Sequence, residues 1–470
     1  MLEVTGDHIA FLNDEDLREL VGLLCEAEVR AAGLSAAAVT WGGDQNATDG
    51  GVDVRVELPS GKTIDGFIRR PNTGFQVEAT DMPPGEIWEE MRPKDVLRPS
   101  IVELMEQSGA YIIVSSQGSV SDTALRNRKK KMRAALAGSP KPEQLSVDFY
   151  DRNRIATWVR SHSGLVHWVR HKIGRPLQGW QSYSNWSAAP AGSSDEYLVD
   201  EKARIRIRTG ITDKDHSIRE GIRRIRTRLG TSRGIARLVG LSGVGKTRFA
   251  EALFDDRIGD SALNPALAHY TNIADEPDPQ PGVMLSQLVA SKSPAILVVD
   301  NCPSDLHKRL TQQCQSASGS GNVSLLTIEY DIREDLPEET DVIELKAASG
   351  DLIESLLASR YPHLSQVDRQ RIAEFSGGNA RIAIALASTA SHGGTLASLK
   401  DEDLFQRLFE QRNPTDPNLF RAAESFALVY SFDGVDVADD IRNSLVACMD
   451  IVRVGSDGKY GFIGNWAAPG

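Results

Sequence analysis

The stretch GIARLVGLSGVGKTRFAEALFD, residues 234–255, decides the fold of the central part of the chain. It holds the pattern GxxxxGK followed by Ser or Thr, from Gly240 to Thr247, with an apolar run before it and an amphipathic run after it. This order predicts a buried strand, a glycine-rich turn and a helix. Apolar runs at 295–299 and 323–328 predict further strands. The alternation indicates a parallel sheet with crossover connections, and therefore an α/β fold.

The glycine-rich turn has the residue types that phosphate binding requires. Glycines let the backbone curl so that successive N–H groups point at phosphate oxygens, and the start of the following helix adds partial positive charge. Lys246 is expected to reach the β- and γ-phosphates, and Thr247 to offer its hydroxyl to Mg²⁺. The predicted ATP/ADP contacts are Gly240, Ser242, Gly243, Val244, Gly245, Lys246, Thr247 and Arg248. A glycine turn without a ligand would not need both flanks, so we favour the nucleotide site.

A second part of the nucleotide site is predicted in the run AILVVDNC, residues 295–302. Asp300 ends an apolar strand, where it would hold Mg²⁺ through water; the alternative is a carboxylate that only caps the strand. Asn301 comes next, and because an amide is a poor base we expect slow ATP hydrolysis, which suits a switch better than a motor. Thr327 and Arg333 belong to a later strand and its exit, where a polar or basic group would sense the γ-phosphate or simply face solvent.

These motifs, together with the segment GGNARIAIAL at 377–386, resemble the STAND-type signal-transduction NTPases over about residues 215–430. In that family the last segment reads GGNPLAL, and its proline touches the nucleotide base; here Ala380 stands in place of that proline. The resemblance implies ATP binding that favours self-association. In the family a winged-helix domain and a sensor array follow, and because the chain stops just inside the winged-helix region we expect the sensor to be missing.

A hairpin is predicted in DGGVDVRVELPSGKTIDGFIRRPNTGFQVEAT, residues 49–80. Asp53 would lie on its first strand, and Gln76 and Glu78 would share one face of the second, because alternate residues of a strand point the same way. Carboxylates presented by neighbouring strands can hold Mg²⁺ for phosphodiester cleavage. We therefore predict that Asp53 is a metal ligand and that all three residues belong to a site that cuts nucleic acid. The alternative is an ordinary charged hairpin.

This arrangement resembles the PD-(D/E)xK nucleases, in particular the Mrr-type domains, over about residues 10–170. Those domains carry a helix glutamate, then DGGxD, then QxK. The resemblance implies that a helix glutamate, Glu28 or else Glu26, completes the catalytic set. Glu78 replaces the lysine, and an ionised glutamate donates no hydrogen bond. Two hypotheses follow: either Glu78 acts as a base on metal-bound water, or the site has lost its activity.

The composition is that of an ordinary globular protein, with 40% hydrophobic and 25% charged residues. Because the formal net charge is -12, a contact with nucleic acid would need a local basic patch such as RNRKKKMR at 126–133. The four cysteines show no CxxC spacing, which favours a reducing cytoplasm over a disulfide framework. The N-terminus lacks a signal-peptide pattern, and the apolar runs are far shorter than the roughly 20 residues of a membrane span.

The fold class that we predict is α/β: a restriction-endonuclease-like α/β domain, then a parallel-sheet P-loop NTPase domain, then a helical region. The predicted segments are a restriction-endonuclease-like domain at 1–173, a linker at 174–214, a P-loop NTPase core at 215–346, a helical lid at 347–395 and a partial winged-helix-like region at 396–470.

Two hypotheses of function follow. In the first, ATP binding and slow hydrolysis control the assembly of a metal-dependent nuclease with DNA as its substrate, as in bacterial antiviral defence proteins, under an unknown trigger. In the second, the chain is a nucleotide-binding regulatory scaffold whose N-terminal domain is inactive and only binds DNA or protein. Glu78 is the residue that separates the two hypotheses.

Overall fold

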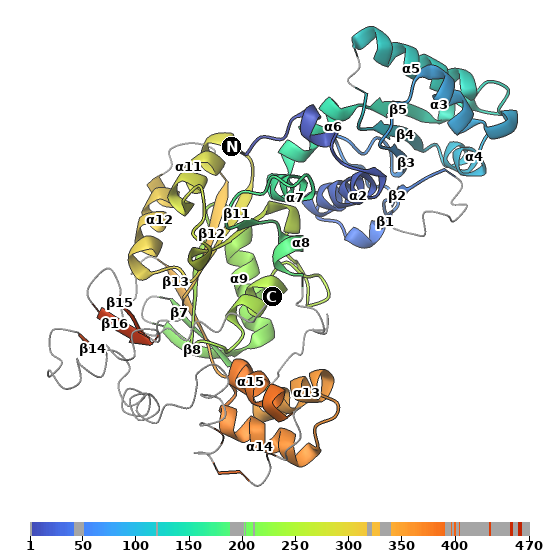
Figure 1. The fold of residues 1–470 in the computed structure, drawn as a ribbon. Coiled ribbons are helices and arrows are strands. Elements are labelled where there is room, and N and C mark those ends of the chain that lie inside the picture. Colours follow the sequence, from blue (N-terminus) through green and yellow to red (C-terminus); the bar gives the residue numbers. More distant parts are fainter. Residues whose placement is uncertain are drawn as a thin grey trace. The chain divides into compact units, whose positions relative to one another are not determined.

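The computed structural model describes residues 2–41, 51–118, 121–188, 202, 204–209, 212–316, 322–329, 340–390, 396, 399–400, 404, 432–433, 452–454 and 459–462. The chain divides into two compact units, Met1–Ala347 and Ala348–Gly470. The first unit is α/β and holds two large sheets, and the described part of the second holds helices and a small sheet (Figure 1). Among the described residues, no helix is both long and apolar enough to cross a membrane.

The N-terminal sheet is mixed, and its strand order is β1-β2-β3-β4-β5. The strands are β1 (Val39–Trp41), β2 (Val54–Glu57), β3 (Asn72–Glu78), β4 (Ala110–Ser115) and β5 (Ser146–Tyr150). The first three run antiparallel to one another, and β3, β4 and β5 run parallel. The strand β4, which lies between β3 and β5, is buried along its whole length, which explains why its sequence is largely an apolar run.

Helices cover both faces of this sheet. One apolar cluster joins it to α1 (Gly6–Ile9), α2 (Asp14–Ala31), α6 (Arg152–Ser161) and α7 (Leu165–Lys172), and another joins it to α3 (Pro84–Met91), α4 (Pro99–Glu106) and α5 (Asp122–Ala135). The helix α2 begins where the side chain of Asn13 accepts a hydrogen bond from the backbone of Asp16. Its buried residues Leu17, Val21 and Leu24 recur at helical spacing and face the sheet.

The second sheet has the strand order β6-β10-β11-β12-β9-β13-β7-β8. Its strands are β6 (Trp180–Gln181), β7 (Arg204–Thr209), β8 (Thr212–Ser217), β9 (Ile235–Val239), β10 (Ala268–Asn272), β11 (Ala295–Asp300), β12 (Val323–Ile328) and β13 (Asp341–Leu345). The five strands from β10 to β13 in this order run parallel, and antiparallel strands extend both edges. The prediction of an α/β chain with a largely parallel second sheet is therefore confirmed.

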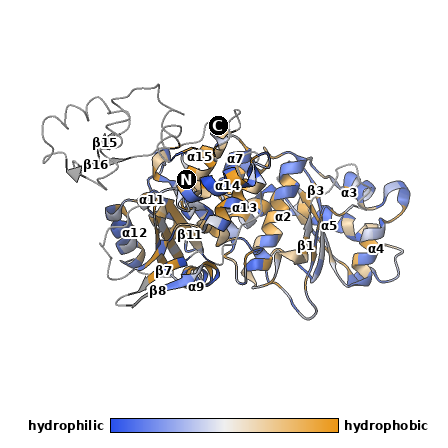
Figure 2. Ribbon diagram, turned by 90° about the horizontal axis from the view of Figure 1, so that it is seen from below, coloured by the Kyte–Doolittle hydropathy of each residue, from blue (hydrophilic) through white to orange (hydrophobic). Residues whose placement is uncertain are grey.

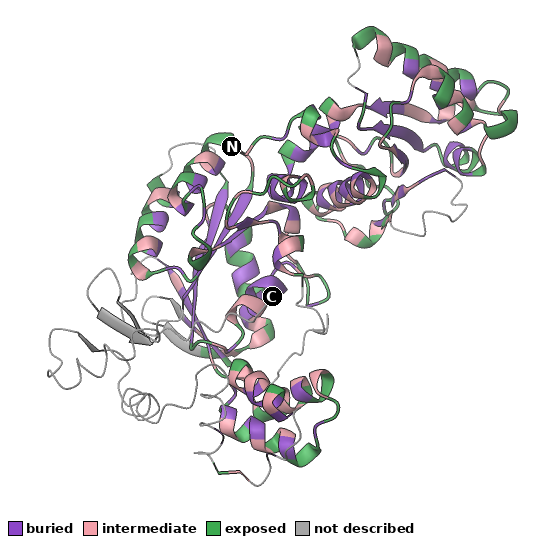
Figure 3. Ribbon diagram, viewed as in Figure 1, coloured by how far each residue is buried: buried purple, intermediate pink, exposed green. Residues whose placement is uncertain are grey.

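Helices pack against both faces of this sheet. They are α8 (Tyr183–Trp186), α9 (Ile218–Gly230), α10 (Lys246–Ala252), α11 (Pro281–Ser291) and α12 (Ser304–Ser316). The first unit also has short 3₁₀ helices at Ala36–Ala38, Pro93–Asp95, Pro142–Gln144, Pro265–Leu267 and Ile273–Asp275. The strands pack against α8, α9 and α10 on one face and against α11 and α12 on the other. Burial of the strands is visible in Figure 3, and Figure 2 shows their hydrophobic colouring, for example along β11.

The connections of the second sheet point to one edge as a ligand site. The chain leaves β9 for β10, beyond β12 and β11, whereas β13 lies on the opposite side of β9. In open α/β sheets, ligands bind at the carboxyl ends of the strands where the connections part in this way. Gly240 follows β9 directly and Asp300 ends β11, so both lie at this carboxyl edge.

The segment 174–214, predicted as a linker, contributes strands to the second sheet and the short helix α8. Within it, β6 pairs with β10, and β7 pairs with β13 and β8. Trp180 and Trp186 are both buried. Trp180 belongs to the apolar cluster on one face of the second sheet and Trp186 to the cluster on the other, which explains the aromatic content of this stretch.

The unit Ala348–Gly470 contains the helices α13 (Gly350–Arg360), α14 (Gln366–Ser376) and α15 (Ala380–Ala390), which share one apolar cluster. It also contains a sheet of β14 (Phe432–Asp433), β16 (Lys459–Phe462) and β15 (Val452–Val454). Most of the predicted winged-helix-like region 396–470 lies outside the described residues.

A buried pair of histidines joins α7 to the second sheet. Nε2 of His167 lies 2.8 Å from Nδ1 of His269 on β10, and Nε2 of His269 lies 2.9 Å from the hydroxyl of Ser163. Burial lowers the pKa of His167 to about 3, with a smaller effect of Arg170 in the same direction, and burial also lowers the pKa of His269. Both imidazoles are therefore neutral in the folded chain at neutral pH.

These histidines predict a loss of stability in weak acid. Below about pH 6.5 the unfolded chain binds a proton at His167 that the folded chain does not bind until about pH 3. The neutral His167 therefore makes its full contribution to the free energy of unfolding above pH 6.5. That contribution falls by about 1.4 kcal/mol per pH unit as the pH drops toward 3. Urea unfolding at several pH values from 7 to 5 should show this slope, and His167→Gln should flatten it. An unchanged slope in the variant would contradict the assignment.

Candidate functional site

The loop after β9 needs glycine at two positions for reasons visible in its backbone. A Cβ atom on Gly240, whose φ is +149°, would lie 2.5 Å from the carbonyl oxygen of Leu345 on β13. Gly245 has a φ of +95°, a left-handed conformation that side chains disfavour. The loop can therefore curl tightly at the carboxyl edge of the sheet, with α10 starting immediately after it.

Lys246 folds back over this loop. Its Nζ donates to the carbonyl oxygens of Gly240 and Leu241, at 2.8 Å each. These contacts hold the ammonium beside the curled backbone, where the sequence predicts phosphate oxygens. A lysine so placed can exchange carbonyl partners for a more strongly attracting anion.

Asp300 collects hydrogen bonds from three directions at the same edge. Its Oδ2 accepts from the hydroxyl of Thr247, at 2.8 Å, and from the hydroxyl of Tyr270, at 3.1 Å. Its Oδ1 accepts from the backbone N–H of Asn301, at 2.8 Å. Because Asp300 is only 6% exposed, this set of contacts fixes the orientation of its carboxylate.

The pairing of Thr247 with Asp300 fits a magnesium ion. A hydroxyl and a carboxylate are hard oxygen ligands, and Mg²⁺ in nucleotide sites is commonly held by few protein oxygens together with phosphate and water. The hydroxyl oxygen of Thr247 can bind the ion while the hydroxyl still donates its hydrogen bond to Asp300. The two residues predicted from separate motifs thus lie in direct contact.

The other predicted nucleotide contacts surround the loop. Ser242 is exposed, Gly243 is half-buried with a φ of +85°, and Val244 is buried in the apolar cluster beneath. Arg248 is half-buried and pairs with Glu251, with 2.8 Å between Nη1 and Oε2. Val244 therefore anchors the loop through its side chain, so that only its backbone is left to meet a phosphate.

The residues predicted to act on the γ-phosphate have other partners. The amide of Asn301 donates to the side chain of Asn272 on β10, at 2.9 Å. The hydroxyl of Thr327 lies 2.8 Å from Nδ1 of the buried His307, and Thr327 is itself fully buried. Arg333 lies outside the described residues.

The segment GGNARIAIAL has a local structural role. Gly377 and Gly378 have φ values of +55° and +81°, and they end α14. The side chain of Asn379 then accepts hydrogen bonds from the backbone of Arg381 and Ile382, which starts α15. The two glycines and the asparagine are therefore explained by a helix–helix corner within this unit.

In the N-terminal sheet, the predicted metal-site residues do come together. Asp53 directly precedes β2, and its Oδ2 accepts a hydrogen bond from the backbone of Val77 on β3, at 2.7 Å. Nε2 of Gln76 donates to Oε1 of Glu78, at 3.1 Å. Burial raises the pKa of Glu78, and the nearby carboxylates of Asp14 and Asp53 raise it further, although the bond from Gln76 opposes them. The site thus gathers several carboxylates in a place that is partly shielded from water.

The guanidinium of Arg18 lies against the second carboxylate oxygen of Asp53. Nε of Arg18, on α2, lies 2.8 Å from Oδ1 of Asp53, whose side chain is only 5% exposed. One carboxylate oxygen thus faces a backbone amide and the other a cation. A divalent metal ion at this oxygen would have to displace Arg18 or accept its repulsion. Among the described residues, no group of three or more His, Cys, Asp and Glu side chains is arranged to hold a metal ion.

Glu28 and Glu26 have partners away from Asp53. Nε1 of Trp158 donates to Oε1 of Glu28, at 2.8 Å, and Nε1 of Trp41 donates to Oε1 of Glu26, at 2.7 Å. Ten residues separate Glu28 from Arg18, which amounts to about 15 Å along a helix. The side chain of Glu28 therefore lies beside Trp158 and near Gly66 of the hairpin, whereas the side chain of α2 that contacts Asp53 is Arg18.

The basic helix α5 uses much of its charge within the domain. Nη2 of Arg128 pairs with Asp81 at 2.7 Å, Nζ of Lys129 pairs with Asp148 at 2.5 Å, and Nζ of Lys131 lies 4.3 Å from the ring centroid of Trp88. A charge that is already paired adds less to the attraction of a phosphate backbone. The run RNRKKKMR is therefore only in part a free basic surface.

Comparison with known proteins gives distant structural similarity only. No protein-family model matches the chain, and no curated protein matches it. A Signal Transduction ATPase with Numerous Domains (STAND) protein with a tetratricopeptide repeat sensor, from Pyrococcus horikoshii, is similar with a TM-score of 0.29 and 13% identity over 53% of this chain and 42% of that chain. The chain thus spans less than half of that protein's length.

Two further solved structures are similar at the same level. They are a Trip13 protein of Rhizobiales, with a TM-score of 0.27 and 12% identity over 41% of this chain and 78% of that chain, and PCH-2 of C. elegans, with a TM-score of 0.26 and 13% identity over 37% and 60%. These similarities identify no residue of the site at the carboxyl edge of the second sheet.

Several site residues were not predicted from the sequence. Asn272 ends β10, the strand beside β11, and contacts Asn301, while Tyr270, two residues before that end, reaches Asp300 with its hydroxyl. The tendency of ligands to bind at strand carboxyl ends would have singled out this position once the strand order was known. Arg18 gave no signal, because its pairing with Asp53 depends on how α2 crosses the sheet.

Proposed function

We propose that the chain is a nucleotide-operated switch, which binds ATP or ADP with Mg²⁺ at the loop after β9 and hydrolyses ATP slowly. The observation that carries this proposal is the contact of Thr247 with Asp300 beside the curled loop and Lys246. Residues of two separate motifs meet there as Mg²⁺ ligation requires.

The chain's own groups account for binding and for slow turnover. Lys246 would give up the carbonyls of Gly240 and Leu241 for the phosphates, and Thr247 and Asp300 would hold the metal ion. When bound, Mg²⁺ supplies neutralisation of the phosphate charge. Asn301 offers an amide already bonded to Asn272 in the place next to Asp300, so no carboxylate there removes a proton from water.

We further propose that nucleotide binding favours self-association, as the resemblance to the STAND NTPases implies. The N-terminal domain would then serve as the module that assembly brings together. Its partner would be DNA or another protein. The nucleotide site does not itself define the signal that triggers assembly.

Of the two N-terminal hypotheses, the contact between Arg18 and Asp53 favours the inactive binding module over the nuclease. Phosphodiester cleavage needs open carboxylate oxygens for a metal ion. Here Asp53 is bonded on both oxygens, and Glu28 is held by Trp158 elsewhere on α2. Arg18 does the neutralising that a metal ion would otherwise do.

This view predicts that Asp53 binds no divalent metal ion. In nucleotide-free protein, Asp53→Asn should leave the number and affinity of Mn²⁺ sites unchanged, as measured by electron paramagnetic resonance of free Mn²⁺. Wild type and Asp53→Ala should also nick plasmid DNA equally little with Mg²⁺ or Mn²⁺. The metal count needs no trigger, so it decides the question even where cleavage is silent. Loss of one Mn²⁺ site in Asp53→Asn would restore the nuclease hypothesis.

A further inference from the structure

Tyr270 contacts the proposed magnesium residue Asp300 from the neighbouring strand. It lies on β10, is only 6% exposed, and donates its hydroxyl to Oδ2 of Asp300 at 3.1 Å. Neither of the sequence motifs that define the nucleotide site includes Tyr270. Its contact with Asp300 arises because β10 and β11 are paired in parallel, with Tyr270 beside Val298 in register.

The hydrogen bonds on Asp300 leave the two carboxylate oxygens unequal. A carboxylate has about four acceptor positions, two on each oxygen. On Oδ2, Thr247 and Tyr270 each use one. On Oδ1, the backbone N–H of Asn301 uses one, at 2.8 Å. The direction that remains for a water molecule of a bound metal ion therefore lies on Oδ1.

An aromatic cluster fixes the ring of Tyr270. The ring of Trp186, on α8, stacks on it with centroids 4.4 Å apart and an interplanar angle of 9°. Trp186 in turn meets Phe254 edge-on, at 6.0 Å. Because the ring has a stacked neighbour, its hydroxyl is held toward Asp300 before any ligand arrives.

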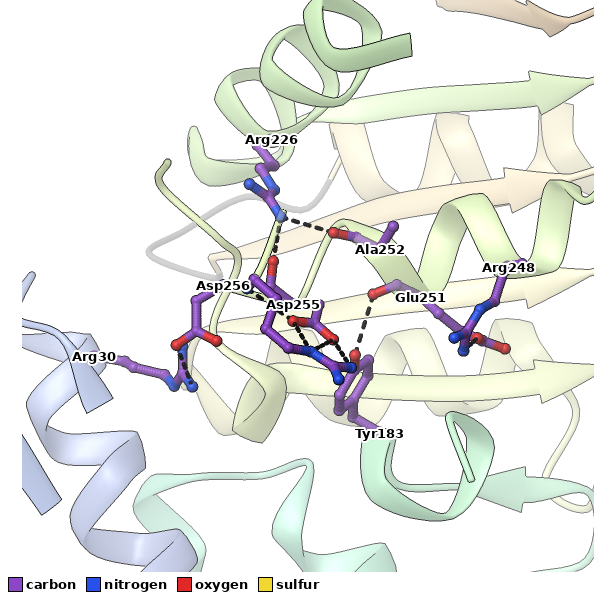
Figure 4. A network of polar contacts seen from close by, with 9 residues as sticks. Arg30, Tyr183, Arg226, Arg248, Glu251, Ala252, Asp255 and Asp256 are labelled. Atoms are coloured by element: carbon purple, nitrogen blue, oxygen red, sulfur yellow. Dashed lines mark hydrogen bonds and ion pairs between the residues drawn. The ribbon is translucent and has the colours of Figure 1, made fainter. Parts of the chain in front are cut away.

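A second tyrosine of the same cluster provides a natural comparison. Tyr183, also on α8, meets Trp186 edge-on at 5.9 Å, and its hydroxyl donates to the backbone carbonyl of Glu251 at 3.2 Å (Figure 4). Tyr183 thus shares the packing and has a part-buried hydroxyl bond of its own. Its hydroxyl contacts the end of α10, whereas that of Tyr270 contacts the proposed metal residue.

We propose that Tyr270 is a positioning residue for the metal ion, which orients Asp300 so that Oδ1 meets the water shell of Mg²⁺. This inference rests on the proposed nucleotide function and extends it. Outer-shell partners of metal-binding groups commonly change metal affinity by about 10- to 100-fold when they are removed. Because Asp300 would act through water, we expect an effect near the lower end of that range.

The experiment measures ATP binding by calorimetry, first in EDTA and then over a series of Mg²⁺ concentrations. Tyr270→Phe keeps the ring stack and removes only the hydroxyl. It should raise the Mg²⁺ concentration at half-saturation about tenfold and leave ATP affinity in EDTA within about twofold of wild type. Tyr183→Phe, the matched control, should leave both quantities within about twofold.

A second measurement needs no nucleotide. Urea unfolding of Tyr270→Phe, Asp300→Asn and the double variant gives the coupling between the hydroxyl and the carboxylate, which for residues in contact should change the unfolding equilibrium constant by about twofold or more. The same cycle with Tyr183→Phe should give a coupling near zero. No coupling between Tyr270 and Asp300 would overturn the contact on which the inference depends.

The outcomes separate this inference from the function beneath it. Equal Mg²⁺ half-saturation in wild type and Tyr270→Phe overturns the positioning role alone, as does an equal shift in Tyr183→Phe. ATP binding by wild type that is independent of Mg²⁺ also overturns it, while leaving nucleotide binding in place. Absence of ATP binding by wild type overturns the proposed function, and the positioning role falls with it.

Discussion

Replacing Arg226 with methionine is expected to destabilise the chain by about 4 kcal/mol or more, because a buried network of charged hydrogen bonds is lost. Arg226 lies on α9, is only 3% exposed, and donates to five backbone carbonyls. Those carbonyls belong to Ala252, Leu253, Asp255, Ile258 and Asp260, at 2.6 to 2.9 Å. Figure 4 shows Arg226 pointing at the segment that follows α10.

The expected loss has a clear physical source. The last carbonyls of a helix have no partner within the helix, and Arg226 supplies one to the end of α10. Methionine fills a similar volume but offers no donor. The carbonyls of Ala252, Leu253 and Asp255 each keep one backbone donor, whereas those of Ile258 and Asp260 lose the bond from Arg226 without a backbone replacement. A buried polar group left without a partner costs about 1–3 kcal/mol, and each lost bond to the charged guanidinium adds to the loss. Because α10 carries Lys246 and Thr247, nucleotide affinity should fall together with stability.

Arg223 gives the matched control on the same helix. Its side chain is 67% exposed, and it pairs with Glu220, three residues away. Arg223→Met should leave the free energy of unfolding close to that of the wild type, as is usual for an exposed ion pair. Urea unfolding of the two methionine variants measures the difference directly. Equal destabilisation by both variants would contradict the role given to Arg226.

Replacing Lys246 with alanine is expected to weaken ATP binding at least about 100-fold, equivalent to roughly 2.7 kcal/mol. The ammonium is held by Gly240 and Leu241 in the loop that we propose cradles the phosphates. Charge-assisted hydrogen bonds to phosphate are among the strongest that a side chain makes. The same variant should no longer change its molecular mass in solution when ATP is added.

An exposed lysine of the same unit controls for the loss of charge. Lys308 lies on the surface of α12, so Lys308→Ala should bind ATP with wild-type affinity. Calorimetry gives the affinities, and light scattering coupled to gel filtration gives the mass. Retention of ATP binding in Lys246→Ala would refute the proposed phosphate contact. Retention of ATP-dependent assembly in a variant that binds no ATP would refute the switch.

The proposed nucleotide site is the part of the molecule that local sequence predicts well. A glycine-rich turn between an apolar strand and a helix has one compact solution, and its glycines at 240 and 245 meet backbone constraints that only they satisfy without strain. The placing of Asp300 at the end of β11 follows from the same kind of local pattern. Its contact with Thr247 then follows from the parallel order of the strands.

What sequence could not supply depends on contacts between distant elements. Tyr270 meets Asp300 only because β10 lies next to β11, and Arg18 meets Asp53 only because α2 crosses the hairpin at one particular turn. The position of Glu28 has the same origin: it lies on the same helix as Arg18, but at the end that contacts Trp158. Local spacing fixes neither the order of strands nor the angle of a helix.

The measurement that tests the central claim most directly is calorimetry of the unmodified chain with ATP and with ADP in magnesium buffer. The contacts of Lys246, Thr247 and Asp300 predict one nucleotide bound per chain, with an affinity that falls when Mg²⁺ is removed. Absence of binding by either nucleotide at millimolar concentration would contradict the account.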